Sequence, residues 1–441
     1  METATSIAFF SLPLSFDVAI FHKERIQPSI MNGNPEKLFV AMVGLPARGK
    51  STIASKLREN LRKDAIKTRI FNNGQLRRRL MRENTSSPEF YNPNNREGVK
   101  FREKIALINI QRAKRYLEEE GNIAILDATN VSLNRRNTIM NLVNRYPLLF
   151  IECINNDEEI LEASIKRKTH LSEFQHLSEE SAIHSFKQRI NYYSSIYQRL
   201  QRERNFVCID SLDNKILQEE IRDPLPYYDR IRDFLVTDSV SNFFLIRHGE
   251  TYFNLENRIG GDSPLTEKGK AQARALALHF KKKTIPVIFT SEKIRTIETA
   301  DPIKELQSHC SIIPLSEFNE IDSGVCEAMS YEEIRERMPS IYASRKLDKY
   351  NYVYPGGEGY VTMQGRIDRG IKKALYLSGN ARNVMIVGHR AVNRMILSHF
   401  LYRRKEDVPY IYIPQDKFYH IIATQDKKLF QLKRFEPISK T

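Results

Sequence analysis

The hydrophobic residues of the N-terminal half fall into short apolar runs that are separated by longer amphipathic stretches. The runs LFVAMVG, TRIFNN, IAILDA, LLFIECI and FVCID predict strands, and EGVKFREKIALINIQRAKRYLEEEG and SEESAIHSFKQRINYYSSIYQRLQRER predict helices between them. Strands that alternate with helices in this way are typical of a parallel sheet covered by helices. The C-terminal half has similar apolar runs, NFFLIR, VIFTS and NVMIVG. The pattern therefore predicts an α/β protein whose sheets are mainly parallel.

The domain organisation follows from the length and from one charged segment. With 441 residues, the chain is long enough for two or three domains that each bury a core. Residues 211–240 are charged and carry two prolines within a helical pattern, which places a boundary near Ser239. We therefore predict an N-terminal extension at residues 1–36, a first domain at 37–239 and a second domain at 240–441.

The composition narrows the class of protein. Hydrophobic residues make up 41% of the sequence and charged residues 28%, the balance of an ordinary soluble protein, and no apolar run is long enough to cross a membrane. The four cysteines are far apart and form no C-x-x-C pair, which predicts reduced thiols in a cytoplasmic protein. The formal net charge of +15 predicts an anionic partner, and nucleic acid, an anionic membrane and phosphorylated metabolites all qualify.

The first apolar run leads directly into a phosphate-binding motif, GLPARGKS, which matches G-x-x-x-x-G-K-[ST] at every position. Backbone N–H groups of such a loop close around phosphate oxygens, the lysine reaches the β- and γ-phosphates, and the serine binds Mg²⁺. A later strand ends in Asp127, a second predicted Mg²⁺ contact or a group that polarises an acceptor hydroxyl. Lys50 and Asp127 are thus predicted catalytic residues, and Ser51 and Asp127 predicted metal ligands. The predicted ATP-binding residues are Gly44, Leu45, Pro46, Ala47, Arg48, Gly49, Lys50, Ser51 and Thr52.

Basic residues from several predicted elements are scattered through the same half. Arg77, Arg102, Arg135 and Arg189 are examples, and Lys166 and Lys168 form another group. A kinase whose acceptor already carries a phosphate needs several cations to bind that phosphate without displacing ATP. For a single arginine outside a recognised motif, a solvated helix face is the more frequent explanation.

The second half carries a different reactive set. NFFLIRHGE ends an apolar strand in Arg247 and His248, and R-H-G at a strand end is typical of phosphatases that use a histidine nucleophile. An imidazole nitrogen attacks phosphorus while arginines hold the equatorial oxygens. Arg295 follows the strand VIFTS, and His389 follows NVMIVG and supplies a further donor. Glu320 is the predicted general acid for the leaving alkoxide. Placement after strands puts this site at the carboxyl edge of a parallel sheet.

The wider motifs resemble one known family. FNNGQLRRR, FYNPNNREGVKFREK, DATNVSLNRR and FKQRINYYSSIYQRL in the first half, and RIGGDSPLTEKGK, NEIDSGVCEAMSYEEIRERMP and DKYNYVYPGGEGY in the second, resemble the bifunctional 6-phosphofructo-2-kinase/fructose-2,6-bisphosphatase family. The resemblance covers residues 37–435. It implies an N-terminal P-loop kinase domain and a C-terminal histidine-phosphatase domain of the phosphoglycerate mutase type.

The resemblance also implies substrate-binding residues. For fructose 6-phosphate they are Arg77, Arg102, Thr129, Arg135, Lys168, Arg189 and Tyr193, with Lys166 as the alternative to Lys168. For fructose 2,6-bisphosphate they are Arg247, Asn254, Gly260, Tyr331, Arg345, Lys349, Tyr360 and Arg394. The family has His-Gln where this chain has His389-Arg390, and we expect the extra cation to alter the kinetics without abolishing activity.

These residues predict an enzyme with two opposed activities. It would make fructose 2,6-bisphosphate from fructose 6-phosphate and MgATP, and hydrolyse it through phosphorylated His248, so controlling glycolytic flux. The expected partners are these substrates, without nucleic acid or membrane, and the resemblance implies a homodimer formed through the kinase domains. Residues 1–36 are predicted to pack on the phosphatase half and restrain it.

Two other interpretations are compatible with parts of the sequence. The net charge and the joining of a P-loop kinase to a phosphatase also fit an enzyme that processes nucleic-acid ends, although the sequence shows no recognisable nucleic-acid-binding module or basic tail. The third interpretation is a regulatory scaffold with an inactive kinase half. The intact Lys50, Ser51 and Asp127 argue against it.

Overall fold

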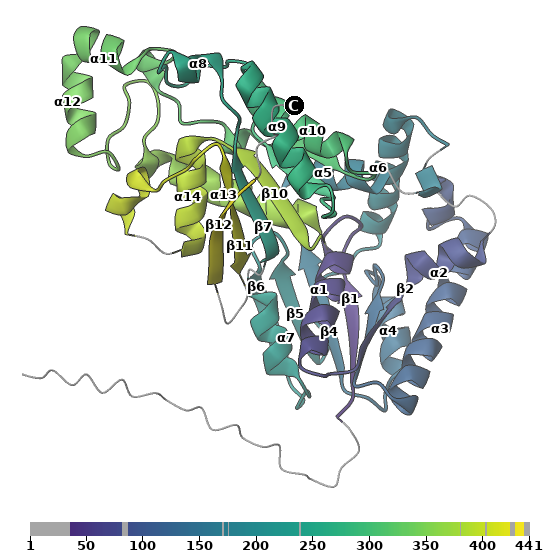
Figure 1. Cartoon of the computed structure of the whole chain (residues 1–441). Coiled ribbons are helices and arrows are strands. Elements are labelled where there is room, and N and C mark those ends of the chain that lie inside the picture. The colour runs from purple at the N-terminus through teal and green to yellow at the C-terminus, as the bar shows by residue number, and fades with distance from the viewer. Residues whose placement is uncertain are drawn as a thin grey trace, which may run out of the picture. The chain divides into compact units, whose positions relative to one another are not determined.

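Two six-stranded sheets organise the part of the chain that the structure describes (Figure 1). The computed structural model describes residues 36–81, 87–169, 172–174, 176–237, 240–379, 381–401, 404–423 and 428–435. The predicted extension lies outside the described residues except at Glu36, and so does the predicted boundary residue Ser239. The packing of the extension on the phosphatase half therefore stays a prediction.

The first sheet has the strand order β2-β3-β1-β4-β5-β6. Its first five strands pair in parallel, and β6 pairs antiparallel with β5 at the edge. The strands are β1 (Leu38–Val43), β2 (Thr68–Asn72), β3 (Ile123–Asp127), β4 (Leu148–Ile154), β5 (Asn205–Asp210) and β6 (Lys215–Ile221). The helices are α1 (Lys50–Lys63), α2 (Asn73–Leu80), α3 (Arg96–Glu119), α4 (Leu133–Leu142), α5 (Glu158–Thr169), α6 (Glu179–Ser195) and α7 (Tyr228–Leu235), with the short 3-10 helices η1 (Pro88–Tyr91) and η2 (Ser172–Phe174).

The central strand β1 shows why the first sheet is covered on both faces. All six of its residues are buried, and successive side chains of a strand point to opposite faces. Val40 belongs to a cluster with Leu57 of α1, whereas Phe39 belongs to a cluster with Ile110 of α3. The continuous apolar run that predicted a buried strand thus supplies the cores of both faces.

Two predicted elements differ from the structure. The helix predicted over SEESAIHSFKQRINYYSSIYQRLQRER ends at Ser195, because the following chain is held elsewhere: Gln198 N–H donates to Val131 at 3.0 Å, and Gln198 accepts from Arg136 at 3.0 Å. The segment read as a charged helical pattern contains the edge strand β6, and α7 follows the two prolines. Charged side chains are common on edge strands, since one side of such a strand faces solvent, and they mask the strand in the sequence.

The second sheet has the strand order β12-β11-β7-β10-β8-β9. The strands β7, β10, β8 and β9 pair in parallel, and β11 and β12 add an antiparallel edge beside β7. The strands are β7 (Val240–Arg247), β8 (Val287–Thr290), β9 (Ser311–Pro314), β10 (Asn383–Gly388), β11 (Lys417–Ala423) and β12 (Lys428–Arg434). The helices are α8 (Tyr252–Leu255), α9 (Glu267–Phe280), α10 (Ile294–Glu305), α11 (Tyr331–Arg337), α12 (Pro339–Leu347), α13 (Tyr360–Ser378) and α14 (Arg390–Leu401), with the 3-10 helices η3 (Ser316–Phe318), η4 (Gly324–Cys326) and η5 (Lys405–Tyr410).

The strand β7 has the same two-sided burial as β1. Phe243 and Leu245 pack into one cluster with residues of α13 and α14, and Phe244 and Ile246 pack into another with residues of α9 and α10. Each domain is therefore a doubly covered, mostly parallel sheet, as the sequence predicts. None of the helices in the described part of the chain combines the length and the apolar character that a membrane crossing requires.

The first testable prediction concerns a buried ion pair that braces the loop after β3. Arg136 and Glu203 are each 1% exposed, and the guanidinium also donates to the carbonyl of Val131 at 2.8 Å. Arg136→Met leaves the carboxylate buried without its cation, so we expect the free energy of unfolding to fall by about 3–5 kcal/mol. Urea denaturation of the full chain measures this.

The control is the exposed pair Arg204–Asp223. Arg204→Met removes the same charge and leaves the partner in solvent, so we expect the free energy of unfolding to stay nearly unchanged. Equal losses in the two variants would contradict a structural role for the buried pair.

Candidate active sites

The phosphate-binding loop joins β1 to α1 through two glycines with positive φ. Gly44 has φ +135°, and a Cβ at this position would lie 2.5 Å from the carbonyl oxygen of Cys153. Gly49 has φ +83° and caps the N-terminus of α1. The backbone N–H of Gly44 donates to the carbonyl of Thr129 at 2.9 Å, which ties the loop to the segment after β3. The structure thus forms the predicted loop, with the N-terminal end of a helix directed at it.

Lys50 and Asp127 lie together beside this loop. Lys50 is buried, and burial lowers its pKa to about 8, against the opposing effects of Cys153 and Asp127. Its ammonium group donates to the carbonyl of Leu45 at 2.5 Å. Asp127 is 4% exposed at the end of β3 and accepts a hydrogen bond from Asn72. A buried cation and a buried carboxylate therefore act on one another electrostatically at the carboxyl edge of the sheet.

The ring of Tyr91, in η1, gathers several of the predicted sugar-phosphate residues. The guanidinium carbons of Arg189, Arg77 and Arg102 lie 4.1 Å, 5.5 Å and 6.0 Å from its centroid. The ring of Tyr193 lies 6.0 Å away, centroid to centroid. These residues come from α2, α3 and α6, so the fold brings together side chains that are far apart in the sequence. Guanidinium groups over an aromatic face are held by the negative potential of the ring.

Two carboxylates accompany these cations. Arg77 pairs with Glu173 of η2, and burial lowers the pKa of Arg77 to about 10. Arg135 donates from Nε to Glu103 at 3.1 Å. The counter-ions keep the arginines oriented while the region as a whole remains basic.

The two lysines near the end of α5 have different surroundings. Burial lowers the pKa of Lys168, and the charges acting on it include those of Asp127 and Arg189. Lys168 therefore faces the same region as Lys50, whereas Lys166 is exposed. Of the two alternatives, the structure brings Lys168 to the site.

In the second domain, strand pairing brings two histidines together. β7 and β10 are parallel neighbours, with Arg247 opposite Gly388 at their ends. His248 and His389 follow directly, and their ring centroids lie 5.3 Å apart. The predicted convergence at the carboxyl edge is thus present for both residues.

His248 is buried, neutral and held in one tautomer. Burial lowers its pKa well below the ordinary value, and the positive charges of Arg295 and Arg247 lower it further. Its Nδ1 lies 2.8 Å from the carbonyl oxygen of Gly249. Because a carbonyl only accepts, Nδ1 carries the proton and Nε2 keeps its lone pair. The imidazole is therefore prepared as a nucleophile at Nε2.

His389 holds one of the arginines in place. Nε of Arg295 donates to Nδ1 of His389 at 3.2 Å, so the ring proton is on Nε2, which donates to Ser291 at 2.8 Å. Arg295 also donates to the carbonyl of Gly261 at 2.8 Å. The N–H donor predicted at His389 is directed at Ser291 in this structure, and the contact with Nδ1 orients Arg295.

Arg247 and Glu320 complete the centre of the site. Burial lowers the pKa of Arg247 to about 9, and the positive charge of Arg390 lowers it further. Its Nη1 donates to the carbonyl of Ile413 at 3.2 Å. Glu320 is half-buried, accepts from its neighbour Ile321 at 3.0 Å, and acts electrostatically on both Arg247 and Arg295. A carboxyl group thus lies within the field of both guanidiniums.

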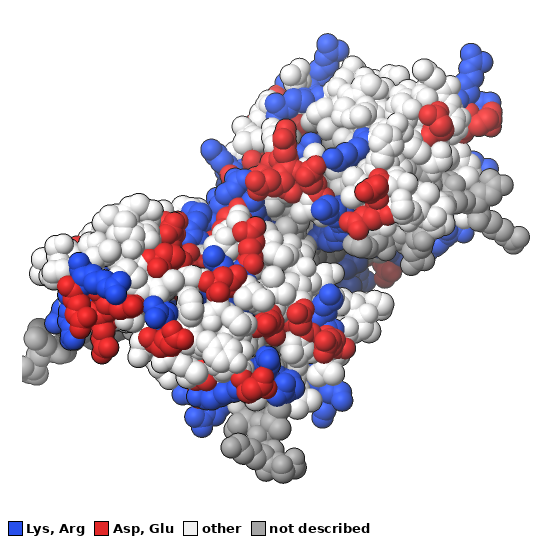
Figure 2. All heavy atoms as spheres, turned by 90° about the horizontal axis from the view of Figure 1, so that it is seen from above, with Lys and Arg blue, Asp and Glu red and all other residues white. Residues whose placement is uncertain are grey.

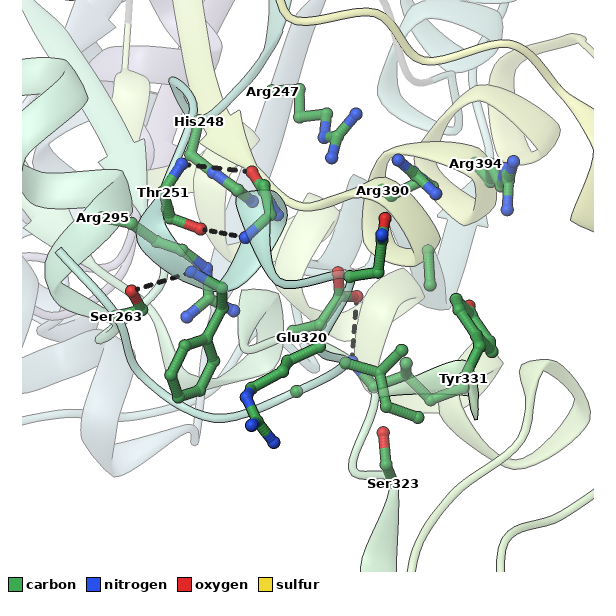
Figure 3. Close-up of a pocket in the computed structure, with 18 of the residues that line it drawn as sticks. Arg247, His248, Thr251, Ser263, Arg295, Glu320, Ser323, Tyr331, Arg390 and Arg394 are labelled. Carbon is green, nitrogen blue, oxygen red and sulfur yellow. Dashed lines mark hydrogen bonds between the residues drawn. The ribbon is translucent and has the colours of Figure 1, made fainter. Parts of the chain in front are cut away.

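More cations line the same pocket, which has a volume of about 330 Å³ (Figure 3). Arg394 donates to the hydroxyl of Tyr360 at 3.0 Å and to the carbonyl of Ile411 at 2.8 Å. Burial and the neighbouring arginines lower the pKa of Lys349 to about 8. The predicted residues that line this pocket are Arg247, Asn254, Gly260, Tyr331, Arg345, Lys349, Tyr360 and Arg394, and Arg390 joins them.

Residues 25–242 match the 6-phosphofructo-2-kinase family, and residues 243–436 match the histidine phosphatase superfamily (branch 1). The chain is 35% identical to human 6-phosphofructo-2-kinase/fructose-2,6-bisphosphatase 4 over 85% of this chain and 80% of the relative. It is 34% identical to rat 6-phosphofructo-2-kinase/fructose-2,6-bisphosphatase 1 over 93% of this chain and 87% of the relative. The chain belongs to the 6-phosphofructo-2-kinase/fructose-2,6-bisphosphatase family.

Among solved structures, the alpha-ribazole phosphatase from Shigella flexneri aligns with 44% of this chain and 95% of its own at a TM-score of 0.40 and 22% identity. The family assignment rests on the sequence relatives.

As a member of the family, the chain is a bifunctional enzyme with a 6-phosphofructo-2-kinase domain and a fructose-2,6-bisphosphatase domain. This favours the bifunctional interpretation over nucleic-acid end processing. On the face seen in Figure 2, basic side chains are interspersed with acidic ones.

Several residues of the two sites were not assigned a role from the sequence. Gln415 donates to Asn254 at 2.8 Å and to the carbonyl of His248 at 3.3 Å, yet it lies in a loop outside any motif. Ser291 and Tyr91 were likewise not predicted. A serine after a strand and a tyrosine in a Pro-rich segment are too common to single out, and only their contacts reveal them.

The protonation of His248 is the second testable prediction. Because burial and two arginines disfavour its charged form, we expect the ring to stay neutral on acidification from pH 7 to about pH 5.5, below the ordinary histidine pKa of about 6.5. Long-range ¹H–¹⁵N correlation spectra of histidine-labelled enzyme measure this, and they should show the proton on Nδ1. His248→Gln assigns the signal by its disappearance. A midpoint near the ordinary value, or a proton on Nε2, would contradict the prediction.

Proposed function

We propose that the residues described above carry out two opposed reactions on one metabolite. The kinase domain makes fructose 2,6-bisphosphate from fructose 6-phosphate and ATP, and the phosphatase domain returns it to fructose 6-phosphate and phosphate. The observation that carries this proposal is the pair of sites at sheet edges. One has a phosphate loop beside Lys50 and Asp127, and the other has a neutral His248 between two guanidiniums.

In the kinase domain, the loop N–H groups and Lys50 hold the β- and γ-phosphates of ATP. With a pKa of about 8, Lys50 is mostly protonated at pH 7, and bound phosphates favour its charged form further. Asp127 accepts a hydrogen bond from the 2-hydroxyl of the sugar and takes its proton as the oxygen attacks the γ-phosphorus in line. The bond from the γ-phosphorus to the bridging oxygen breaks, and ADP leaves. The 6-phosphate of the acceptor is held by Arg77, Arg102, Thr129, Arg135, Lys168, Arg189 and Tyr193.

The metal expected in this reaction is Mg²⁺. It usually takes one or two carboxylates or hydroxyls from the protein and its other ligands from phosphates and water. Ser51, in the first turn of α1, and Asp127 fit this sparse ligand set, and no larger group of metal-binding side chains occurs among the described residues. When bound, the ion would neutralise charge on the transferred phosphoryl group.

In the phosphatase domain, Nε2 of His248 attacks the phosphorus of the 2-phosphoryl group. The bond from phosphorus to the sugar oxygen breaks, and Glu320 gives its proton to the leaving alkoxide. Arg247 and Arg295 stabilise the charge on the equatorial oxygens. Water then attacks the phosphorus of the phosphohistidine and gives a proton to the Glu320 carboxylate. The bond from phosphorus to Nε2 breaks, which regenerates the imidazole and releases phosphate.

The 6-phosphate of the bisphosphate is assigned to the remaining cations of the pocket. Arg345, Lys349 and Arg394 are candidates because they line the pocket. Lys349 donates to the carbonyl of Pro409 at 3.4 Å, and the guanidinium carbon of Arg345 lies 5.6 Å from the ring centroid of Tyr331, so these contacts, like those of Arg394, are not with carboxylates. Tyr331 and Tyr360 line the same pocket, and so do Asn254 and Gly260, which we assign to the part of the pocket near His248. Anions are favoured there because these cations are partly desolvated.

Other parts of the proposal rest on the sequence and on the family resemblance alone. The domain limits of 37–239 and 240–441, the homodimer through the kinase domains, the cytoplasmic location and the control of glycolytic flux stay predictions.

The test of the proposed function, and the third prediction, follows the product of both reactions. The purified chain is incubated with γ-labelled ATP, Mg²⁺ and fructose 6-phosphate, beside His248→Ala. We expect fructose 2,6-bisphosphate to accumulate to a higher level with the variant, because it lacks the nucleophile that removes the product. Adding Lys50→Met to either protein should abolish the product. No product from the wild type or from His248→Ala would mean that the phosphate loop serves another acceptor.

The fourth prediction concerns Arg390, where the family has Gln. Arg390 is exposed at the pocket, and its positive charge acts on Arg247, His248 and Lys349. Arg390→Gln removes this attraction for phosphate, so we expect the KM for fructose 2,6-bisphosphate and the inhibition constant of fructose 6-phosphate to rise about three- to tenfold at low salt.

The matched control is Lys346→Gln, which removes an exposed charge from α12 outside the pocket. It should leave both constants unchanged. Equal effects of the two substitutions would mean that only the net charge of the domain matters. The difference between the variants should shrink as salt screens the exposed guanidinium.

A further inference from the structure

A helix of the phosphatase domain ends against the phosphate loop of the kinase domain. Both domains belong to one compact unit, Lys37–Thr441. Near the C-terminal end of α13, the hydroxyl of Tyr376 donates a hydrogen bond to the carbonyl of Ala47 at 3.0 Å. The tyrosine is 9% exposed, so the contact is shielded from water. It falls on the middle of the loop that is proposed to bind ATP.

Ion pairs and hydrogen bonds hold this end of α13 on the kinase domain. Lys372 pairs with Asp213 at 2.8 Å, and Arg369 pairs with Asp157 at 2.6 Å. Arg167, on α5, donates to the carbonyl of Leu377. The tyrosine is thus presented to the loop by a helix that is anchored on either side of it.

The loop residue that Tyr376 contacts has an unfavourable backbone conformation. Ala47 has φ +62°, in the left-handed region that costs a residue with a Cβ roughly 1–2 kcal/mol. The next carbonyl, that of Arg48, lies 3.0 Å from the hydroxyl of Ser211, which shares its proton with the carbonyl of Ile154 at 3.1 Å. Two successive carbonyls of the loop are therefore held by side chains from outside it. Such a conformation persists where the surroundings over-determine it.

The planarity of the peptide bond connects these contacts to phosphate binding. In a trans peptide, the C=O and the N–H of one unit point in opposite directions. Drawing the Ala47 carbonyl toward Tyr376 therefore directs the N–H of Arg48 to the opposite side. In the same way, the bond from Ser211 to Arg48 directs the N–H of Gly49. These are N–H groups that a loop of this type offers to phosphate oxygens.

The aromatic ring packs on the outer side of the same loop. A Cβ added at Gly49 would lie 3.2 Å from Cε2 of Tyr376 and 3.2 Å from Oγ of Ser211. Both side chains therefore lie against the loop backbone and limit its outward movement. The ring also borders a small cavity of about 50 Å³, together with Thr52 and Ile53 of α1.

We propose that Tyr376 is a positioning residue of the kinase site, supplied by the phosphatase domain. Its hydroxyl fixes the peptide between Ala47 and Arg48 so that the N–H faces the nucleotide phosphates. The inference rests on the proposed role of the loop in binding ATP. It makes the kinase reaction dependent on a residue outside the kinase domain.

The fifth prediction tests this with Tyr376→Phe, which removes the hydroxyl and keeps the ring. We expect the KM for ATP to rise about three- to tenfold, the effect of one lost hydrogen bond of ordinary strength. The KM for fructose 6-phosphate and the phosphatase kcat/KM should stay unchanged, and the melting temperature of the full chain should fall no more than in a variant that loses a comparable tyrosine hydrogen bond elsewhere. Ser211→Ala should raise the KM for ATP in the same direction, because it releases the neighbouring carbonyl.

Tyr419→Phe is the matched control, since its hydroxyl donates to the carbonyl of Tyr412 at 2.7 Å within the phosphatase domain. It should leave the KM for ATP unchanged. The inference is overturned if Tyr376→Phe also leaves this KM unchanged, or if it lowers both activities and the melting temperature together, as a merely structural residue would. A wild-type chain without kinase activity in the same assay would overturn the kinase assignment and the inference with it.

Discussion

Parallel pairing of neighbouring strands is the constraint on which both sites depend. In a parallel pair the carboxyl ends lie at the same edge, so residues that follow two distant strands become neighbours. β1 pairs with β3, which brings the phosphate loop beside Asp127. β7 pairs with β10, which brings His248 beside His389. A shift of register in either pair would move Asp127 away from the phosphate loop or His389 away from His248, because contacts between sequence neighbours do not hold these groups together.

Burial of positively charged side chains gives the two sites their affinity for phosphate. Desolvation lowers the pKa of Lys50 and of Lys349 to about 8, and that of Arg247 to about 9. Each of these shifts means that the charged form is disfavoured in the folded protein, and a bound phosphate relieves this cost. Burial also keeps His248 neutral, and the charges of Arg295 and Arg247 add to this effect, so the cations that attract phosphate help to leave the nucleophile unprotonated. Binding and reactivity thus have one electrostatic origin.

The outcome for individual elements shows how far a sequence can be interpreted. The phosphate loop was predictable because its glycines and its lysine serve local geometry, which a short motif specifies completely. The edge strand β6 was missed because a half-exposed strand needs no apolar run. The end of α6 was missed because Gln198 is held by Val131, and that contact is not local. The sequence left Lys166 and Lys168 as alternatives for the substrate-binding lysine, and only the burial of Lys168 beside the site separates it from the exposed Lys166.

The sequence by itself determined the two domain types, the order of the reactive groups and the anionic character of the substrates. These depend on motifs and on apolar periodicity, which act over a few residues. Tertiary structure decided the tautomer of His248, the orientation of Arg295 by His389, and the contact of Tyr376 with Ala47. These depend on distances of a few ångströms between side chains from different elements, and spacing along the chain does not encode such distances.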